Sequence, residues 1–283
     1  MALLTVRNIV RISLDAYGSD TNPLLLLIPG AGAPAQWWPD EFCHDLALNG
    51  HFVVRYSHRD TSFSSHFDSE YQIDELVQDM AAIIKELKQS TVHLVGHSMG
   101  GYLAQIAMCK FPGMFASVTS ISAGPTVSPE VAKSLGMSGA SEVTWQTLMK
   151  NQPQGDFEKD LPGWLIGWRL LNGSRAFDEQ AAIRYTRYLY DGDARNRQAA
   201  YHHMHAMSTV PTSLAKELTK VRCPFLVMHG TEDPLVPVDN GEASARLVPG
   251  SKMYHLVRAG HMFFNKESWQ EITENVLQHI RAV

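Results

Sequence analysis

A serine lies between two glycines in the segment Gly96-His97-Ser98-Met99-Gly100, a spacing that can prepare a hydroxyl group for nucleophilic attack. Residues 92–95 favour a β-strand and residues 101–110 favour a helix, so Ser98 would lie on a sharp strand-to-helix turn. Small residues at 96 and 100 leave room for the strained backbone of such a turn. The hydroxyl would be exposed at the positive end of a helix, where a developing anion is stabilised. An ordinary glycine-rich turn is the alternative.

Serine is a weak nucleophile at neutral pH, so it needs a base and a group that orients the base. Asp233 and His261 each follow a predicted strand, and the order Ser, Asp, His is expected when such a turn supplies the nucleophile. Asp233 precedes a proline and could instead only shape a turn, and the neighbouring Glu232 competes for the role of the acid. We predict a catalytic triad of Ser98, Asp233 and His261.

Acyl transfer also requires hydrogen-bond donors for the negative charge that develops on the attacked carbonyl group. We predict the backbone N–H of Met99, directly after the nucleophile, as one donor and the N–H of Ala31 as the other. Ala31 lies in the loop 29–34, where small residues leave the backbone thin enough to approach a substrate. A flexible surface loop is the alternative.

Alternating strands and helices are expected to position these groups. The predicted strands are an antiparallel pair within residues 5–14, then 24–28, 52–56, 92–95, 118–121, 225–230 and 253–257; the predicted helices are 39–48, 71–87, 101–110, 239–247 and 267–280. This alternation predicts the α/β class, with a mostly parallel sheet covered by helices on both faces. In such sheets, active sites form beyond the carboxyl ends of the strands.

The alternation stops between residues 124 and 211, where helix-like segments rich in aromatic residues follow one another. A gap of this length exceeds an ordinary connection. We therefore predict a helical cap at 124–211, inserted into a core of residues 1–123 and 212–283. Helices that pack on the sheet without a role in binding are the alternative.

Four tryptophans are candidates for contact with a substrate. Trp37 and Trp38 follow the predicted oxyanion loop and could line a pocket or only anchor the loop. Trp145 and Trp168 lie in the predicted cap, whose aromatic residues could instead form a small core of their own.

The composition is that of a soluble globular protein, with 45% hydrophobic and 19% charged residues among 283. A net charge of −5 without blocks of like charge excludes the basic surface of a typical nucleic-acid-binding protein. The N-terminus lacks the features of a signal peptide, and the longest apolar run, 24–29, is too short to cross a membrane. We expect a cytoplasmic protein with a small-molecule substrate; the oligomeric state is not indicated.

The remaining histidines and cysteines do not predict a metal site. His202, His203 and His205 are irregularly spaced for metal ligands, and we interpret them as surface or packing residues and His97 as structural. The three cysteines are widely separated and show neither a disulfide framework nor the spacing of zinc ligands, which favours a reducing compartment.

The serine turn, the loop Gly230-Thr231-Glu232-Asp233 and the pair Gly260-His261 together resemble the α/β-hydrolase superfamily, over nearly the whole chain. Within it, segments 38–42 and 54–61 look like those of the aclacinomycin methylesterase group. The chain is also similar to serine-dependent macrolide esterases, which inactivate antibiotics by opening a lactone ring.

Two segments depart from the superfamily pattern. The oxyanion loop usually begins His-Gly and here reads Pro29-Gly30, a change that leaves a backbone donor intact. The loop after the strand 52–56 usually reads Asp-x-Arg-Gly-x-Gly-x-Ser, whereas Ser57, Asp60 and Ser62 here replace the acid and both glycines. We expect the second change to alter the wall of the pocket or its hydrogen bonds.

These features predict a serine esterase without a cofactor or metal, and the resemblance implies a bulky macrolide or polyketide ester or lactone as its substrate. Carbon–carbon bond hydrolysis or cofactor-free perhydrolysis by the same triad is one alternative, and a ligand-binding receptor with little turnover is another. A dehalogenase is disfavoured because its nucleophile would be an aspartate in place of Ser98.

Overall fold

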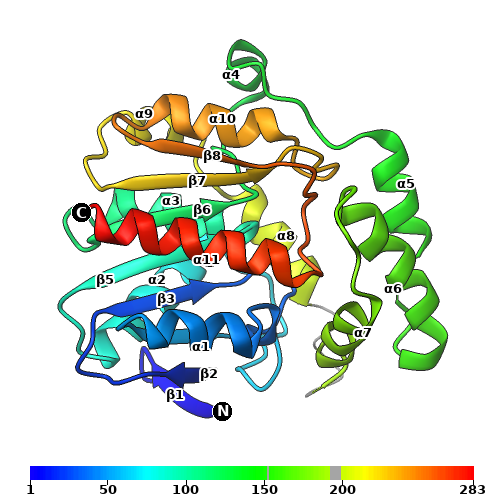
Figure 1. Ribbon diagram of the computed structural model, residues 1–283, viewed down its shortest axis with the longest axis horizontal. Coiled ribbons are helices and arrows are strands. Elements are labelled where there is room, and N and C mark those ends of the chain that lie inside the picture. The colour runs from blue at the N-terminus through cyan, green and yellow to red at the C-terminus, as the bar shows by residue number, and fades with distance from the viewer. Residues whose placement is uncertain (152, 192–198) are drawn as a thin grey trace.

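A mixed β-sheet forms the centre of the computed structural model, which describes residues 1–151, 153–191 and 199–283 (Figure 1). Its eight strands lie in the order β1-β2-β4-β3-β5-β6-β7-β8. The pairings β1–β2 and β2–β4 are antiparallel, and every pairing from β4 to β8 is parallel. The strands are β1 (Ala2–Val6), β2 (Val10–Tyr17), β3 (Leu24–Ile28), β4 (Phe52–Tyr56), β5 (Val92–His97), β6 (Ser117–Ile121), β7 (Phe225–Gly230) and β8 (Lys252–Leu256). The predicted α/β class with a mostly parallel sheet is confirmed.

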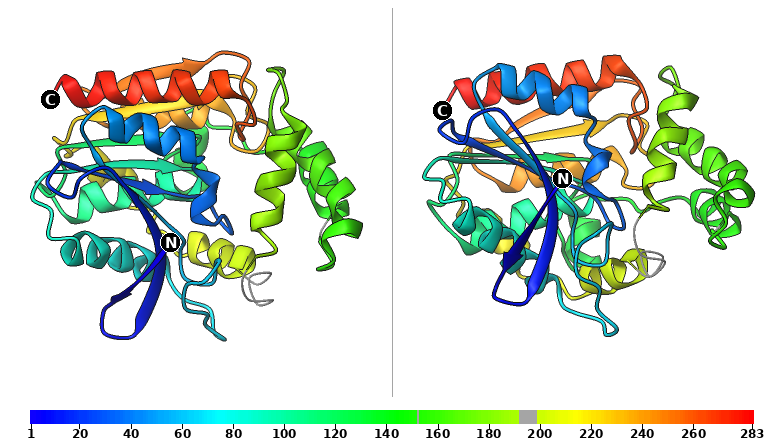
Figure 2. Two further views of the ribbon diagram at one scale, coloured as in Figure 1. Left: turned by 60° about the horizontal axis from the view of Figure 1, so that its bottom comes forward. Right: turned by 90° about the horizontal axis from the view of Figure 1, so that it is seen from below.

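Helices cover both faces of this sheet because its central strands are apolar on both faces. Every residue of β3 is buried, and its side chains point alternately to the two faces. Helices α1 and α11 pack on one face, and α2, α3, α9 and α10 pack on the other (Figure 2). Their bounds are α1 (Asp40–Leu48), α2 (Ile73–Glu86), α3 (Met99–Lys110), α9 (Leu214–Leu218), α10 (Val238–Leu247) and α11 (Lys266–Arg281).

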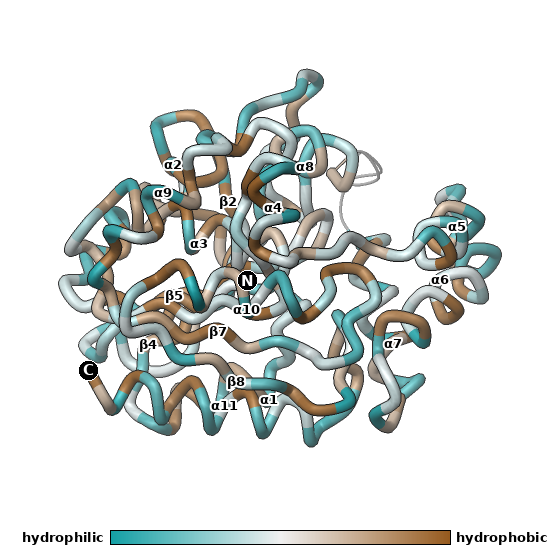
Figure 3. Tube along the Cα trace, turned by 90° about the horizontal axis from the view of Figure 1, so that it is seen from above, coloured by the Kyte–Doolittle hydropathy of each residue, from teal (hydrophilic) through white to brown (hydrophobic). Residues whose placement is uncertain are grey.

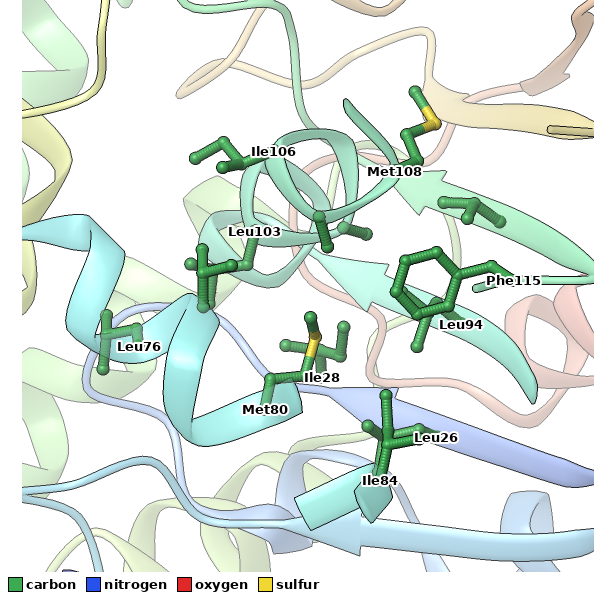
Figure 4. Packing of buried hydrophobic residues seen from close by; sticks show 14 of the residues in the cluster. Leu26, Ile28, Leu76, Met80, Ile84, Leu94, Leu103, Ile106, Met108 and Phe115 are labelled. Carbon is green, nitrogen blue, oxygen red and sulfur yellow. The ribbon is translucent and has the colours of Figure 1, made fainter. Parts of the chain in front are cut away.

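The larger apolar core lies between the sheet and helices α2 and α3 (Figure 4). Leu26 and Ile28 of β3 belong to it together with Met80 and Ile84, which lie one turn apart on α2. Leu103 contributes from α3, the helix that follows Ser98. Burial of an apolar side chain of this size stabilises the fold by about 1.5–3 kcal/mol. The core therefore fixes the position of the helix at whose N-terminus the serine lies.

The helices between β6 and β7 include the predicted cap. They are α4 (Pro129–Ser134), α5 (Glu142–Lys150), α6 (Phe157–Leu171), α7 (Glu179–Tyr188) and α8 (Ala199–Ser208), and no strand occurs among the described residues from 124 to 211. Helices α5, α6 and α7 form a separate layer at one end of the sheet, whereas α8 lies against the core (Figures 1 and 2). The domain bounds at 124 and 211 stay a prediction, and residues 152 and 192–198 of this segment lie outside the described residues.

The predicted strands and helices of the core are present, with bounds that differ at their ends. Helix α3 begins at Met99 rather than at residue 101, directly after the serine. The short helix α9 and the 3-10 turn η1 (Ala35–Trp37) were not predicted, because so few residues carry no helical period of apolar positions.

Hydrophobic residues follow the inner elements of the fold, and α1 and α11 alternate between hydrophilic and hydrophobic residues along their length (Figure 3). This alternation is expected of helices with one face on the core and one in water. Among the helices of the described residues, none is long and apolar enough to cross a membrane.

Buried histidines make the stability of this fold depend on pH. Burial lowers the pKa of His58 and of His93 to about 4 and that of His97 to about 3, from an ordinary value of 6.5. Below pH 6.5 the unfolded chain therefore binds more protons than the native protein. We predict that the free energy of unfolding, measured by urea denaturation at fixed salt, falls as the pH is lowered from 6.5 to about 4. A constant or rising stability over this range would contradict the prediction.

Candidate active site

The turn at Ser98 joins β5 to α3 and has a strained backbone. Ser98 has φ 53° and ψ −121°, a conformation that residues with a side chain rarely adopt. A Cβ atom on Gly96 would overlap the carbonyl oxygen of Gly100, and one on Gly100 would overlap that of Ile28. The Ser98 N–H donates to the carbonyl oxygen of Ile121 on β6 at 2.9 Å, which ties the turn to the sheet. The turn therefore requires glycine at both flanking positions.

The three residues predicted as a triad form one chain of hydrogen bonds. The Ser98 Oγ lies 3.0 Å from Nε2 of His261, and Nδ1 of His261 lies 2.7 Å from Oδ2 of Asp233. Asp233 follows β7 and His261 follows β8, so the parallel strands bring both loops to the same edge of the sheet as Ser98. Because an ionised carboxylate only accepts hydrogen bonds, Nδ1 carries the proton and Nε2 can accept the proton of Ser98.

The Asp233 carboxylate is buried and held from several sides. Its Oδ1 accepts hydrogen bonds from the N–H groups of Leu235 and Val236, at 2.9 and 2.8 Å. Burial alone would raise the pKa of Asp233, but the charge of His261 and hydrogen bonds from His229 and His261 lower this pKa well below its usual value. Asp233 therefore stays ionised beside His261.

The competing acid, Glu232, has a different partner. Its carboxylate accepts hydrogen bonds from the N–H and the hydroxyl of Ser174, at 2.7 and 2.9 Å. Glu232 is exposed and links the β7–α10 loop to the segment after α6, whereas Asp233 is buried. The geometry therefore favours Asp233 over Glu232 as the acid that faces His261.

The loop of His261 is attached to the end of α6. The Gly260 N–H donates to the carbonyl oxygen of Asn172 at 3.0 Å, and the Met262 N–H donates to that of Leu171 at 2.9 Å. These two backbone hydrogen bonds flank His261 and hold its main chain on both sides. Residues of the predicted cap thus position the loop that carries the imidazole.

One predicted oxyanion donor, Met99, directly follows Ser98, and the other, Ala31, directly follows a glycine that contacts Ser98. Met99 is the first residue of α3, so its N–H belongs to the unpaired first turn of a helix. Gly30 lies against the serine, since a Cβ atom on Gly30 would be 3.2 Å from that of Ser98. Within the described residues, neither the Met99 N–H nor the Ala31 N–H donates to a protein group. Both N–H groups are thus without a protein acceptor, as the predicted role requires.

Two side chains from the loop after β4 hold the oxyanion loop. Nε2 of His58 donates to the carbonyl oxygen of Pro29 at 3.0 Å. Oγ of Ser57 accepts a hydrogen bond from the Ala35 N–H at 2.9 Å. The loop from Pro29 to Ala35 is therefore fixed at both ends, and the alternative of a flexible surface loop is not supported.

The loop after β4 keeps a left-handed backbone at the two positions where the superfamily usually has glycine. The φ angle is 68° at Asp60 and 53° at Ser62. The carboxylate of Asp60 accepts hydrogen bonds from the Phe67 N–H at 2.7 Å and from Nδ1 of His202 at 3.0 Å, which offsets the strain at this residue. The departure in sequence thus changes the hydrogen bonds of the loop, one of the two expected outcomes.

Trp37 and Trp38 are both buried, with 2% and 0% of their surface exposed. The indole of Trp37 packs against His97 with 4.8 Å between ring centroids, and Trp38 stacks on Phe42 at 5.5 Å. His97 in turn donates from Nε2 to the carbonyl oxygen of His261 at 2.8 Å. These contacts favour the anchoring role for Trp38, whereas Trp37 also lines a cavity and its contact with a substrate stays a prediction.

The two tryptophans of the predicted cap differ in their surroundings. Trp168 is buried, donates from Nε1 to Oγ1 of Thr186 at 2.8 Å and stacks on Trp164 at 4.8 Å. It also packs against Phe264 with 5.6 Å between ring centroids, so it joins the predicted cap to the core, and its contact with a substrate stays a prediction. Trp145 lies on α5 with 45% of its surface exposed, and its contact with a substrate stays a prediction.

A cavity of about 250 Å³ lies between α7 and the core. Tyr185, Tyr188 and Arg184 of α7 line one side, and Trp37 and Phe263 line the other. Aromatic rings alternate there with charged side chains from both sides, and the described lining includes none of the predicted triad or oxyanion residues.

The three cap histidines lie in two environments. His202 and His203 are buried and bonded to the core, whereas the side chain of His205 is 38% exposed. Nδ1 of His203 accepts a hydrogen bond from the N–H of Gly32 in the oxyanion loop at 2.8 Å, a link that the sequence did not indicate. Within the described residues, no group of three or more His, Cys, Asp or Glu side chains is placed to hold a metal ion.

Comparison with known proteins gives matches over most of the chain. The family model of the alpha/beta hydrolase fold matches residues 23–267. Rhodomycin D methylesterase DauP of Streptomyces sp. (strain C5) is 29% identical over 262 residues, which cover 87% of each chain. The bifunctional esterase/perhydrolase DCH of Acinetobacter calcoaceticus is 26% identical over the full length of both chains. The solved structure of the esterase RhEst1 from Rhodococcus sp. ECU1013 has the same fold, with a TM-score of 0.80, 19% identity and 99% coverage of each chain.

The two neighbouring acids provide a matched test of the geometry. In Asp233→Asn the side-chain oxygen can still accept from Leu235 and Val236, but the amide N–H₂ would face Nδ1 of His261 and impose the wrong tautomer. We predict that this variant reacts with a p-nitrophenyl phosphonate about a thousandfold more slowly or worse, measured by release of nitrophenolate. Glu232→Gln, the control, should react at nearly the wild-type rate. Equal effects of the two substitutions would contradict the assignment.

Proposed function

This chain belongs to the α/β-hydrolase fold family, and we propose that it is a serine hydrolase that cleaves carboxylic esters through an acyl-enzyme. The observation that carries the proposal is the unbroken chain of hydrogen bonds from Ser98 through His261 to Asp233, with distances of 3.0 and 2.7 Å. It gives the serine a base and gives the base an ionised partner. Relatives named esterases, which align over most or all of their length, support ester cleavage.

In the first half of the reaction, His261 takes the proton of Ser98 on Nε2 while Oγ attacks the ester carbonyl carbon. The carbonyl oxygen becomes an anion, which accepts hydrogen bonds from the N–H groups of Met99 and Ala31. The imidazolium then gives its proton to the leaving alcohol as the C–O bond breaks, which leaves the acyl group on Ser98.

In the second half, His261 takes a proton from water, and the hydroxide attacks the acyl-enzyme. The same two N–H groups hold the second oxyanion, and the proton returns to Ser98 as the acid leaves. Asp233 stabilises the positive charge of His261 in both halves and keeps the ring in one orientation. The chemistry needs no cofactor.

We propose that the substrate is the methyl ester or lactone of a bulky polyketide, with the predicted cap supplying part of the binding surface. The methyl ester has the stronger support, because the relative with 29% identity is named a rhodomycin D methylesterase. The cavity between α7 and the core, with Tyr185 and Tyr188 on its wall, would take an aromatic part of the substrate that lies away from the ester carbonyl, because no triad residue lines it.

Perhydrolysis is a second candidate activity, favoured by the full-length match to an esterase/perhydrolase. Hydrogen peroxide would replace water in the second half of the reaction, so that the acyl group leaves Ser98 as a peracid. The residues and the oxyanion donors would be the same.

Turnover of short p-nitrophenyl esters tests the proposed reaction. The wild-type protein should hydrolyse p-nitrophenyl acetate or butyrate, and Ser98→Ala should lower kcat by about 10⁶-fold without loss of the folded state, as judged by circular dichroism. An inactive wild-type protein, or a Ser98→Ala variant with undiminished kcat, would overturn the proposal.

A panel of polyketides tests the substrate class. Incubation with polycyclic polyketide methyl esters should give the free acid, which is lighter than the substrate by one CH₂ unit, and this acid should be absent with Ser98→Ala. Incubation with macrolide lactones reports ring opening as a gain of one water. If only macrolides react, the methyl ester assignment is wrong and the lactone assignment stands.

A further inference from the structure

His203 connects the cap helix α8 to two loops of the core. Its Nδ1 accepts a hydrogen bond from the Gly32 N–H at 2.8 Å, and its Nε2 lies 3.0 Å from the carbonyl oxygen of Arg59. Because a carbonyl oxygen can only accept, the ring proton is on Nε2 and Nδ1 is the acceptor. The side chain has no exposed surface. Both polar atoms of a buried histidine are thus satisfied in one tautomer.

The hydrogen bonds of His203 require a neutral ring. A proton on Nδ1 would face the Gly32 N–H and break that hydrogen bond. Burial lowers the pKa of His203 well below its ordinary value, and the nearby His58 lowers this pKa further. The acceptor at Nδ1 is therefore present at neutral pH.

Gly32 follows Ala31, one of the two residues whose N–H groups are proposed to bind the oxyanion. His58 holds the carbonyl oxygen of Pro29 at 3.0 Å on one side of Ala31, and His203 holds the N–H of Gly32 at 2.8 Å on the other. The peptide N–H of Ala31 lies between these two fixed points. The Ala33 N–H donates to the carbonyl oxygen of Gly30, in the same peptide unit as the Ala31 N–H, at 3.3 Å, and the two imidazole rings hold the peptide units on either side.

We propose that His203 is a positioning residue that, from the cap, orients the Ala31 N–H toward the oxyanion. This inference rests on the proposed function. Oxyanion donors act only when they are fixed in direction before the charge develops, and a misplacement of about 1 Å can lower a rate a hundredfold. Through this hydrogen bond, helix α8 helps to position a catalytic group in addition to covering the site.

His202 offers a matched comparison on the same helix. It is buried like His203, and its Nδ1 lies 3.0 Å from Oδ2 of Asp60, in the loop after β4. No hydrogen bond between His202 and the oxyanion loop occurs among the described residues. Loss of His202 would remove one contact of α8 with the core and leave the acceptor for the Gly32 N–H in place.

Two substitutions of His203 separate its two hydrogen bonds. In His203→Asn the side-chain oxygen can take the place of Nδ1 and accept from Gly32, whereas in His203→Gln the amide N–H₂ can take the place of Nε2 and donate to Arg59. We expect His203→Gln to lower kcat for p-nitrophenyl butyrate about ten- to a hundredfold with little change in KM. His203→Asn should regain most of that loss, and His202→Gln should keep kcat within about threefold of the wild type.

An alkyl trifluoromethyl ketone provides a second readout, because Ser98 adds to its carbonyl group to form a hemiketal with an oxyanion. Its affinity should fall in parallel with kcat in His203→Gln and stay unchanged in His202→Gln. Thermal melting of each variant shows whether it is folded. If His203→Gln does not fold, the tautomer of His203 in the wild-type protein can be measured by long-range proton–nitrogen NMR spectra. A proton on Nε2 alone would support the inference, and a proton on Nδ1 would overturn it.

Failure of the inference and failure of the proposed function give different results. An active wild-type protein whose kcat is unchanged in His203→Gln, or is lowered equally in His202→Gln, would overturn the role of His203 alone. A wild-type protein inactive on every ester would overturn the proposed function, and the role of His203 with it.

Discussion

The strained turn at Ser98 is the constraint on which the rest of the site depends. A serine at φ 53° costs on the order of 1–3 kcal/mol, and it persists because β5 and α3 are fixed on either side by the core. The close contacts of Gly96 and Gly100 leave one path for the chain through this turn. As a result the hydroxyl projects beyond the edge of the sheet, and the N–H of Met99 lies at the start of a helix. The loops of His261, Asp233 and the predicted second oxyanion donor then have to be positioned relative to this turn.

The predicted cap helps to position these groups through two contacts with the core. The end of α6 holds the residues on either side of His261 by backbone hydrogen bonds at 3.0 and 2.9 Å. Helix α8 holds the oxyanion loop through His203. An inserted segment that only covered a pocket would not need such bonds. The predicted cap therefore supports two loops of the site, and loss of either of these two contacts is expected to lower turnover.

Sequence reasoning succeeded where the determining interactions are short in range. The strand-to-helix turn at Ser98, the strands that precede Asp233 and His261 and most helix bounds follow from local periodicity and glycine spacing. The contacts of Gly32 with His203 and of Asp60 with His202 join residues 171 and 142 positions apart, so no local pattern reveals them. The full burial of Trp38 was likewise not predictable, since besides the nearby Phe42 it packs against Trp269 of α11.

The most direct test of the central claim is a crystal structure of the protein after inactivation by a p-nitrophenyl alkylphosphonate. The phosphorus should be bonded to Oγ of Ser98, with one phosphonyl oxygen about 2.7 to 3.1 Å from the backbone nitrogens of both Met99 and Ala31. The phosphonate mimics the tetrahedral intermediate, so this single measurement reports both the nucleophile and the oxyanion donors. Phosphorus on another residue, or a phosphonyl oxygen that reaches neither nitrogen, would contradict the account.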